Sequence, residues 1–288
     1  MSKKDTLLFL LLSAIWGSSF MFIKLGLEGG FSPMALVSLR LLFGALLMAG
    51  IALRRGHRLP TEGRVLAGIA FLGFINNVVP FSLITWSEQH IDSSLAAILN
   101  STVPLFAVIL SHFALADESF TWRRVLGVLL GFGGVLVLFA PGLVASAGSA
   151  ALWGQLAVIV ASAGYAIGSV FARKRLQRVP APVLTTVQLG FALLWTLPLT
   201  ALERPWTLEL TGMAWFAALW LGLLGTGMAY LLFFILLRSI GATPTTMVTY
   251  VIPLFAVIFG VLFLREQVQW QHLLALILII GGVAMVNR

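Results

Sequence analysis

The sequence predicts an all-α integral membrane protein with ten transmembrane helices, arranged as two inverted five-helix repeats. Three observations predict this fold class. The 288 residues are 60% hydrophobic and only 10% charged, whereas a soluble domain is about 45–50% apolar and about 25% charged. Apolar stretches long enough to cross a bilayer recur along the whole chain. The second half of the chain also repeats motifs of the first half.

The ten predicted spans follow from the thickness of the bilayer. A hydrocarbon core about 30 Å thick requires roughly 20 mostly apolar residues per helix. Segments of that length are separated by short connections rich in glycine, proline or basic residues. The predicted spans are residues 5–26, 32–53, 65–87, 93–114, 122–140, 152–173, 182–201, 211–236, 243–264 and 270–287.

The basic residues lie almost entirely on one side of this topology. With a cytoplasmic N-terminus, 14 of the 18 lysines and arginines fall in cytoplasmic segments, and only Arg204 and Arg265 fall in external connections. Cytoplasmic loops of membrane proteins carry such an excess of basic residues. We therefore expect a cell (inner) membrane protein with both termini in the cytoplasm. The net charge of +8 then reflects topology and contact with anionic lipid heads, not nucleic acid binding.

An internal repeat relates the two halves of the chain. The hexapeptide PLFAVI occurs at residues 104–109 and again at residues 253–258, an offset of 149. After a one-residue shift, Gly133-Gly134-Val135 aligns with Gly281-Gly282-Val283. Because the matches stay in register, they predict homologous units rather than chance identities.

The predicted units are residues 1–140 and residues 150–288, with five helices each. Five is an odd number, so the second unit crosses the membrane in the opposite direction. Inverted repeats of this kind occur in many secondary transporters, and there the substrate site lies between the repeats near the middle of the membrane.

The motifs also resemble a known family. Trp16-Gly17-Ser18, Arg40 and the run from PLFAVI through Glu118 to Gly133-Gly134 resemble one EamA-type unit, and the second half resembles another. On these motifs the chain is identified as a member of the drug/metabolite transporter (DMT) superfamily over nearly its whole length. The resemblance implies a ten-helix secondary transporter that exports small amphipathic metabolites by alternating access. It favours the YddG-like exporters of aromatic and other neutral amino acids. A broader drug or purine exporter is the alternative.

Polar and aromatic residues occupy matching mid-span positions in the two halves. A spacing of three or four residues places them on one face of each helix, and these faces predict one central cavity. Tyrosine usually favours membrane interfaces, yet all three tyrosines of the chain fall near mid-span. Packing between helices is the competing interpretation. The predicted substrate-binding residues are Trp16, Phe20, Asn77, Phe81, Asn100, Ser101, Tyr165, Ser169, Thr226, Tyr230, Thr249 and Tyr250.

Three further residues are predicted to act as a gate or hinge. Pro104 and Pro253 occupy equivalent mid-helix positions, and each removes a backbone hydrogen bond, which predicts a kink. Arg40 is the one charge well inside a span, where a charge is costly and functional by default. It either binds a substrate carboxylate or pairs with carbonyls and acids at the outer mouth, such as Glu28, Glu88 or Asp92. We favour the structural or gate role.

The sequence shows no machinery for catalysis. It has no cysteine, no phosphate-binding glycine loop and no clustered histidines or carboxylates, so no catalytic residue, cofactor or metal is expected. None of the ten acidic residues lies in mid-span, which disfavours cationic drugs and proton coupling through a carboxylate. A passive channel and an intramembrane enzyme are the alternatives from other classes. The expected partners are a small-molecule substrate and the lipid bilayer, with the protein a monomer or homodimer.

Overall fold

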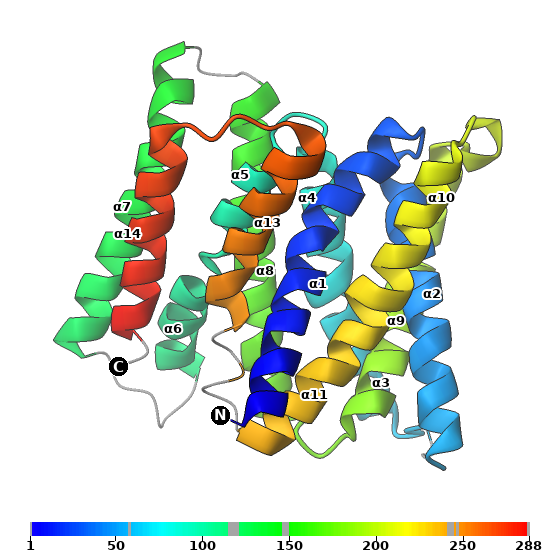
Figure 1. Cartoon of the computed structure of the whole chain (residues 1–288). Helices are drawn as coiled ribbons and strands as arrows, with labels where there is room; N and C mark the ends of the chain where they lie inside the picture. The colour runs from blue at the N-terminus through cyan, green and yellow to red at the C-terminus, as the bar shows by residue number, and fades with distance from the viewer. Residues whose placement is uncertain are drawn as a thin grey trace.

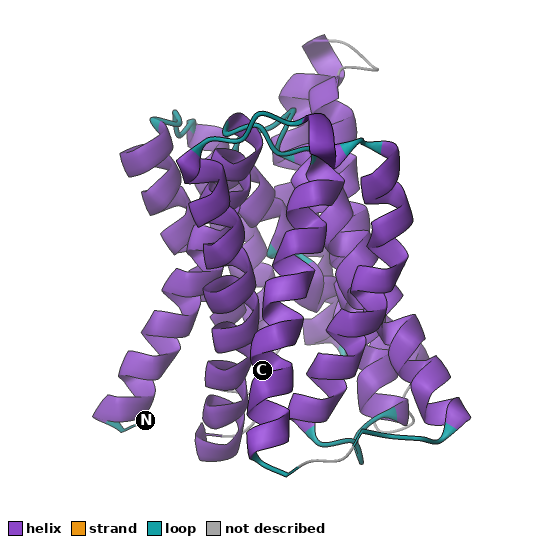
Figure 2. Cartoon of the chain, turned by 90° about the vertical axis from the view of Figure 1, so that its right-hand side faces the viewer, coloured by secondary structure: helices purple, strands orange, loops and turns teal. Residues whose placement is uncertain are grey.

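The helices pack side by side, and the loops gather at two opposite ends of the molecule (Figure 2). Within the described residues there is no strand. In the part of the chain that the structure describes, seven helices, counted with the π-helical segments that continue them, are long and apolar enough to cross a membrane, and two shorter apolar helices lie near the C-terminus. The all-α membrane fold is thus confirmed, while the count of ten crossings stays a prediction. The computed structural model describes residues 2–56, 59–114, 121–145, 150–240, 245 and 248–286.

As far as its residues are described, each predicted span falls on one helix or on a consecutive group of helical segments. The first half comprises α1 (Lys3–Glu28), α2 (Pro33–Arg54), α3 (Gly63–Gly73), the π-helix η1 (Phe74–Val78), α4 (Val79–Ser87), α5 (Ser93–Asn100), α6 (Val103–Ala114) and α7 (Trp122–Ala145). The second half comprises α8 (Ala150–Arg175), α9 (Ala181–Leu202), the short η2 (Pro205–Thr207), α10 (Gly212–Leu219), the π-helix η3 (Trp220–Met228), α11 (Ala229–Ile240), α13 (Val248–Leu264) and α14 (Trp270–Val286).

Local sequence signals place several helix starts. The hydroxyl of Ser2 accepts the backbone N–H of Asp5 at 3.1 Å and caps α1. Pro33 is the first residue of α2, a position where its missing N–H loses no hydrogen bond. The hydroxyl of Thr211 caps α10 by accepting the N–H of Ala214 at 3.2 Å. Such caps satisfy backbone donors that have no partner within the helix.

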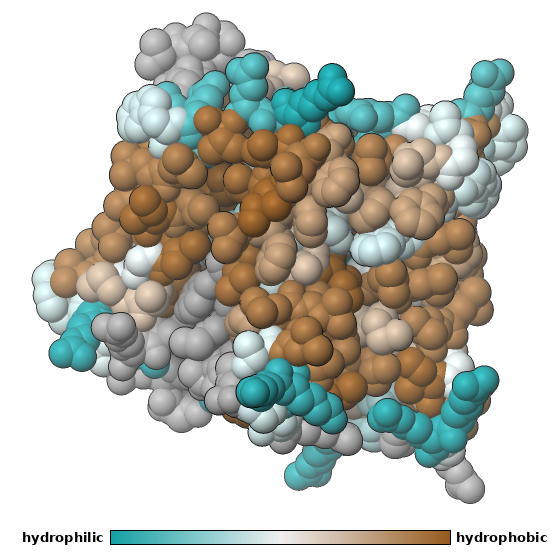
Figure 3. Space-filling model, in the orientation of Figure 1, coloured by the Kyte–Doolittle hydropathy of each residue, from teal (hydrophilic) through white to brown (hydrophobic). Residues whose placement is uncertain are grey.

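The two halves run in opposite directions through the bundle. In Figure 1 the start of α1 and the end of α14 lie at the same end of the molecule, whereas α8, the repeat counterpart of α1, starts at the other end. On the face shown in Figure 3, the described surface is mainly apolar between these ends, and hydrophilic side chains gather at both of them. This belt of apolar side chains is the surface that a multi-pass membrane protein presents to lipid.

Close glycine contacts hold α7 and α14 together at one side of the bundle (Figure 1). A Cβ atom added to Gly282 would lie 2.4 Å from the carbonyl oxygen of Gly127. A Cβ atom on Gly134 would lie 2.9 Å from the carbonyl oxygen of Ala275. Small residues let membrane helices approach this closely and gain van der Waals contact.

The segment predicted as a single helix over residues 93–114 is interrupted at Ser101 and Thr102, between α5 and α6. The hydroxyls of both residues donate to backbone carbonyls in the last turn of α5. Pro104 is therefore the second residue of α6, where it breaks no hydrogen bond. This corrects the mid-helix position expected for Pro104. Pro253, in contrast, lies inside the continuous helix α13.

Candidate functional site

Two π-helical segments at equivalent positions of the repeats carry polar residues of the site. Asn77 lies in η1, and Thr226, its counterpart at an offset of 149, lies in η3. Both side chains are buried. The Thr226 hydroxyl donates to the carbonyl of Leu221, five residues earlier, at 2.9 Å, which is the spacing of a π-helix. Short π-helical segments within α-helices frequently occur at functional sites.

Arg40 lies among the predicted substrate residues. Its Nε donates to the Thr226 hydroxyl at 3.0 Å, and its guanidinium carbon lies 4.0 Å from the centroid of the Phe81 ring. The phenols of Tyr165 and Tyr230 are within electrostatic range of the guanidinium. The structure thus brings Arg40 together with the residues from which the sequence interpretation separated it. We call Arg40, Phe81, Tyr165, Thr226 and Tyr230 the Arg40 cluster.

No carboxylate forms an ion pair with Arg40 in the part of the chain that the structure describes. The acid within electrostatic range is Glu88, which acts on Arg40 less than either tyrosine. The side chain of Arg40 is only 8% exposed. Its hydrogen bond to a described residue uses Nε, so the two terminal nitrogens keep their donors for a ligand. Among the described residues, the positive charge of Arg40 therefore has no ion-pair partner inside the bundle.

Amide side chains surround the hydroxyl of Tyr230. Asn76 and Asn77 lie within its reach, and Gln188 donates its amide to Oδ1 of Asn77. The Nδ2 of Asn77 has no hydrogen-bond partner among the described residues. The sequence interpretation did not include Asn76 or Gln188. Gln188 is the one carboxamide in the predicted span 182–201, and that signal would have identified it.

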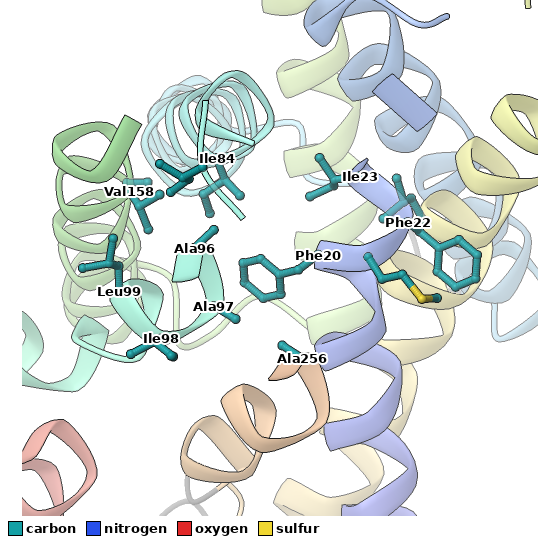
Figure 4. Close-up of a cluster of buried hydrophobic side chains, with 14 of the residues drawn as sticks. Phe20, Phe22, Ile23, Ile84, Ala96, Ala97, Ile98, Leu99, Val158 and Ala256 are labelled. Carbon is teal, nitrogen blue, oxygen red and sulfur yellow. The ribbon is translucent and has the colours of Figure 1, made fainter. Parts of the chain in front are cut away.

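Trp16 and Phe20 contribute apolar surface from α1 and are not in the Arg40 cluster. The Trp16 ring packs against Phe233, with 5.9 Å between the ring centroids. Phe20 points from α1 toward Ala97 of α5 and Ala256 of α13 (Figure 4). These two aromatic side chains join α1 to helices of both halves.

The remaining predicted site residues contact nearby helices, or their side chains lie outside the described part of the structure. Asn100 accepts the Ser162 hydroxyl at 3.4 Å, which links α5 to α8. The hydroxyl of Ser169 is exposed and donates to the carbonyl of Tyr165 on its own helix.

Two predicted residues belong to α13. Thr249 is half-buried there. The side chain of Tyr250 lies outside the described part of the structure, and so does Glu118 of the repeat motif. The structure therefore brings five of the twelve predicted substrate-binding residues together near Arg40, namely Asn77, Phe81, Tyr165, Thr226 and Tyr230.

A second polar region is a cavity of about 660 Å³ at the end of the bundle where α1 ends. We call it the outer cavity, after the orientation predicted from the sequence, and its charged lining includes Lys24, Glu28, Asp92, Arg265 and Glu266. The Glu266 carboxylate accepts the backbone N–H and the hydroxyl of Ser93, both at 2.7 Å. It therefore caps the N-terminus of α5, where a negative charge is favourable.

Comparison with known proteins decides the family. A model of the EamA-like transporter family matches residues 4–140 and again residues 152–288. The chain belongs to the EamA-like transporter family. This EamA-like protein is therefore a membrane transporter, and its DMT superfamily assignment is confirmed.

Relatives of this EamA-like protein align over almost its whole length. It is 28% identical over 281 residues to "Uncharacterized inner membrane transporter YedA" of Escherichia coli (strain K12), covering 95% of this chain and 87% of the relative. It is 26% identical over 272 residues to "Uncharacterized transporter YoaV" of Bacillus subtilis (strain 168), covering 94% and 92%. A solved crystal structure shares the fold at a TM-score of 0.68 and 21% identity, over 99% of this chain and 98% of that one.

Proposed function

We propose that this EamA-like protein exports small amphipathic metabolites that carry a carboxylate, first among them neutral and aromatic amino acids. The observation that supports this substrate class is the uncompensated charge of Arg40. A buried charge is costly unless it is paired and hydrogen-bonded, and within a membrane such a charge typically marks a substrate path. A substrate carboxylate supplies that partner, and the free end of a guanidinium binds it with two parallel hydrogen bonds.

The groups around Arg40 suit the rest of an amphipathic molecule. The rings of Phe81, Tyr165 and Tyr230 offer apolar contact to a hydrophobic side chain. The amide and hydroxyl groups near Tyr230 offer hydrogen bonds to an amino group. A site with apolar walls and a few fixed polar groups is typical of small-molecule recognition.

We propose that transport proceeds by alternating access of the two inverted halves in the cell membrane, with both termini in the cytoplasm. The break between α5 and α6 and Pro253 in α13 are the proposed hinges. At both places the ladder of helical hydrogen bonds is interrupted, so bending there breaks fewer bonds than elsewhere.

The experiment that tests this function is uptake by liposomes containing only the purified protein. We expect saturable uptake of L-phenylalanine with discrimination against D-phenylalanine. Phenethylamine, which lacks the carboxylate, competes poorly because it does not pair with Arg40. Arg40→Gln raises KM roughly 10–100-fold, the range expected when a charge-assisted hydrogen bond is lost. Arg54→Gln on the exposed end of α2 is the matched control and leaves KM unchanged.

Other outcomes of this experiment identify the alternatives. Equal uptake of phenethylamine and L-phenylalanine contradicts recognition of a carboxylate. Uptake of purines or drugs without amino acids indicates the broader exporter, and conductance without saturation indicates a channel. No flux of any metabolite overturns the transport proposal for these substrates.

A further inference from the structure

Glu88 is a buried acid that the proposed substrate binding does not use. It directly follows α4 and is 0% exposed. Neither of its carboxylate oxygens has a hydrogen-bond partner within the described residues. An ionised carboxylate in this position would lose its hydration without compensation, so a buried acid of this kind takes up a proton and becomes neutral.

Charged groups face Glu88 from several elements, and none of the described cations is hydrogen-bonded to its carboxylate. The ammonium group of Lys24 donates to the backbone carbonyl of Glu88 at 2.8 Å, not to the side chain. The carboxylate of Glu266 is occupied by the start of α5. The charged and titratable groups around Glu88 and its loop are Lys24, Arg40, His90, Asp92, Glu266 and His272.

Burial prevails over the nearby cations. It raises the pKa of Glu88 well above the ordinary value of 4.5, and the negative charge of Glu266 raises the pKa further. Lys24 and Arg40 lower the pKa of Glu88, each with a smaller effect than burial. Asp92 responds in the same way, because burial and Glu266 raise its pKa.

Glu88 interacts with both polar regions of the protein. Two of its electrostatic partners, Lys24 and Glu266, line the outer cavity. Its third partner, Arg40, belongs to the Arg40 cluster. A proton that enters from the outer cavity therefore changes the charge that Arg40 experiences.

We propose that Glu88 is a proton-binding site between the outer cavity and the Arg40 cluster, and that this proton is carried together with the carboxylate substrate. The carboxylate binds one proton and becomes a neutral acid, and it returns to a single negative charge when the proton leaves. When Glu88 is neutral, Arg40 keeps its full attraction for a substrate carboxylate. When Glu88 is ionised, it competes with the substrate for Arg40.

The coupling between proton binding at Glu88 and substrate binding at Arg40 determines the energetics of export. This coupling rests on the proposed function. Proton binding and substrate binding strengthen each other by the same factor. Each molecule that leaves down its own gradient then takes one proton with it. An acidic exterior consequently slows export and favours entry.

Infrared spectroscopy of the purified protein over a pH series tests the proton site without any substrate. A protonated carboxyl has a C=O stretching band that a carboxylate lacks. We expect the wild type to show this band at neutral pH, Glu88→Gln to lose it, and Glu28→Gln, an exposed acid on the same cavity, to keep it. Glu88→Asp is the second variant, and it shifts the band while keeping the acid.

Two infrared results overturn the proton site. One is the absence of the protonated-carboxyl band from the wild-type spectrum at neutral pH, and this measurement needs no variant. The other is a band that persists unchanged in Glu88→Gln and Glu88→Asp, since the proton then belongs to another acid such as Asp92.

Liposomes loaded with L-phenylalanine and a pH-sensitive dye test the linkage. We expect efflux to make the interior more alkaline, with about one proton per L-phenylalanine in the wild type and in Glu28→Gln. In Glu88→Gln the ratio of protons to L-phenylalanine falls toward zero. Efflux without proton movement in the wild type, or an unchanged ratio in Glu88→Gln, overturns the linkage. Absence of flux contradicts the proposed function instead, and the infrared series still decides the proton site.

Discussion

The guanidinium carbon of Arg40 lies 4.0 Å from the centroid of the Phe81 ring, so α2 and α4 meet through a cation–π contact inside the bundle. The same side chain donates to Thr226 of the second half. Arg40 thus belongs to the first repeat but is positioned by both. The proposed alternating access moves the two halves relative to each other and would therefore change the contacts of Arg40.

Phe81→Leu removes the ring beneath the guanidinium. A cation–π contact contributes about 0.5–2 kcal/mol, so we expect KM for L-phenylalanine to rise roughly two- to thirtyfold. Phe81→Trp keeps an aromatic face and retains most of the affinity. An unchanged KM in Phe81→Leu would show that the ring does not position Arg40 for binding.

Trp16→Ala and Tyr230→Ala are expected to impair uptake while the protein still folds. Tyr230 offers its hydroxyl among the amides near the Arg40 cluster, and Trp16 supplies an aromatic wall against Phe233. Initial uptake rates, together with gel filtration in detergent, separate loss of transport from loss of folding. Normal transport in both variants would mean that the helix faces with Trp16 and Tyr230 serve only in packing between helices.

Asn77 and Gln188 are expected to be energetically coupled. Gln188→Met leaves Oδ1 of the buried Asn77 without its donor, and an unsatisfied buried polar group costs about 1–3 kcal/mol. Adding Asn77→Leu removes the unsatisfied group, so the double variant is less destabilised than the sum of the two single variants. Unfolding in detergent measures all three, and simple additivity would argue against the coupling.

Gly282→Ala is expected to destabilise the pairing of α7 with α14, because the added Cβ would lie 2.4 Å from the carbonyl oxygen of Gly127. Overpacking of this kind costs about 1–3 kcal/mol. Gly133→Ala on α7 is the control, since its Cβ would meet no atom within 4 Å. Thermal unfolding compares the two, and equal melting temperatures would contradict the close approach.

Glu88 predicts a specific pH dependence of stability. Its pKa is raised in the folded protein, so the stability that comes from burying the neutral acid is fully present below the unfolded value of 4.5. That stability is lost as pH rises toward and through the folded-state pKa, by up to about 1.4 kcal/mol per pH unit. Wild type should therefore lose stability relative to Glu88→Gln over this window. A difference that does not vary with pH would contradict the raised pKa.

The sequence predicted the helices more completely than the site. The sequence singled out Asn77, Phe81, Tyr165, Thr226 and Tyr230 because polar residues and tyrosines at mid-span are rare and because these positions match between the repeats. Their common neighbour could not be found by the same symmetry, because Arg40 aligns with Leu189, which carries no polar group. The repeat therefore pointed away from the residue at the centre of the cluster.

The burial of Glu88 was the second property that residue spacing in the sequence did not reveal. Glu88 follows the last residue of its span, a position that is typically accessible to water, yet the structure encloses it completely. The expectation that no acid lies in mid-span concerned position along a single helix, and Glu88 does lie at the end of its span. Enclosure depends instead on the loops and helix ends that pack around that residue.

By itself the sequence determined the membrane fold, the positions of the helices, the internal repeat and the mid-span residues. The length and the spacing of apolar segments depend only on the order of residues along the chain. Only the tertiary structure decided that Arg40 meets Phe81 and Thr226, that Gln188 bonds to Asn77, and that Glu88 is enclosed. These relationships depend on which faces of distant helices are brought together. Charge pairing and desolvation are properties of that assembly and not of any single helix.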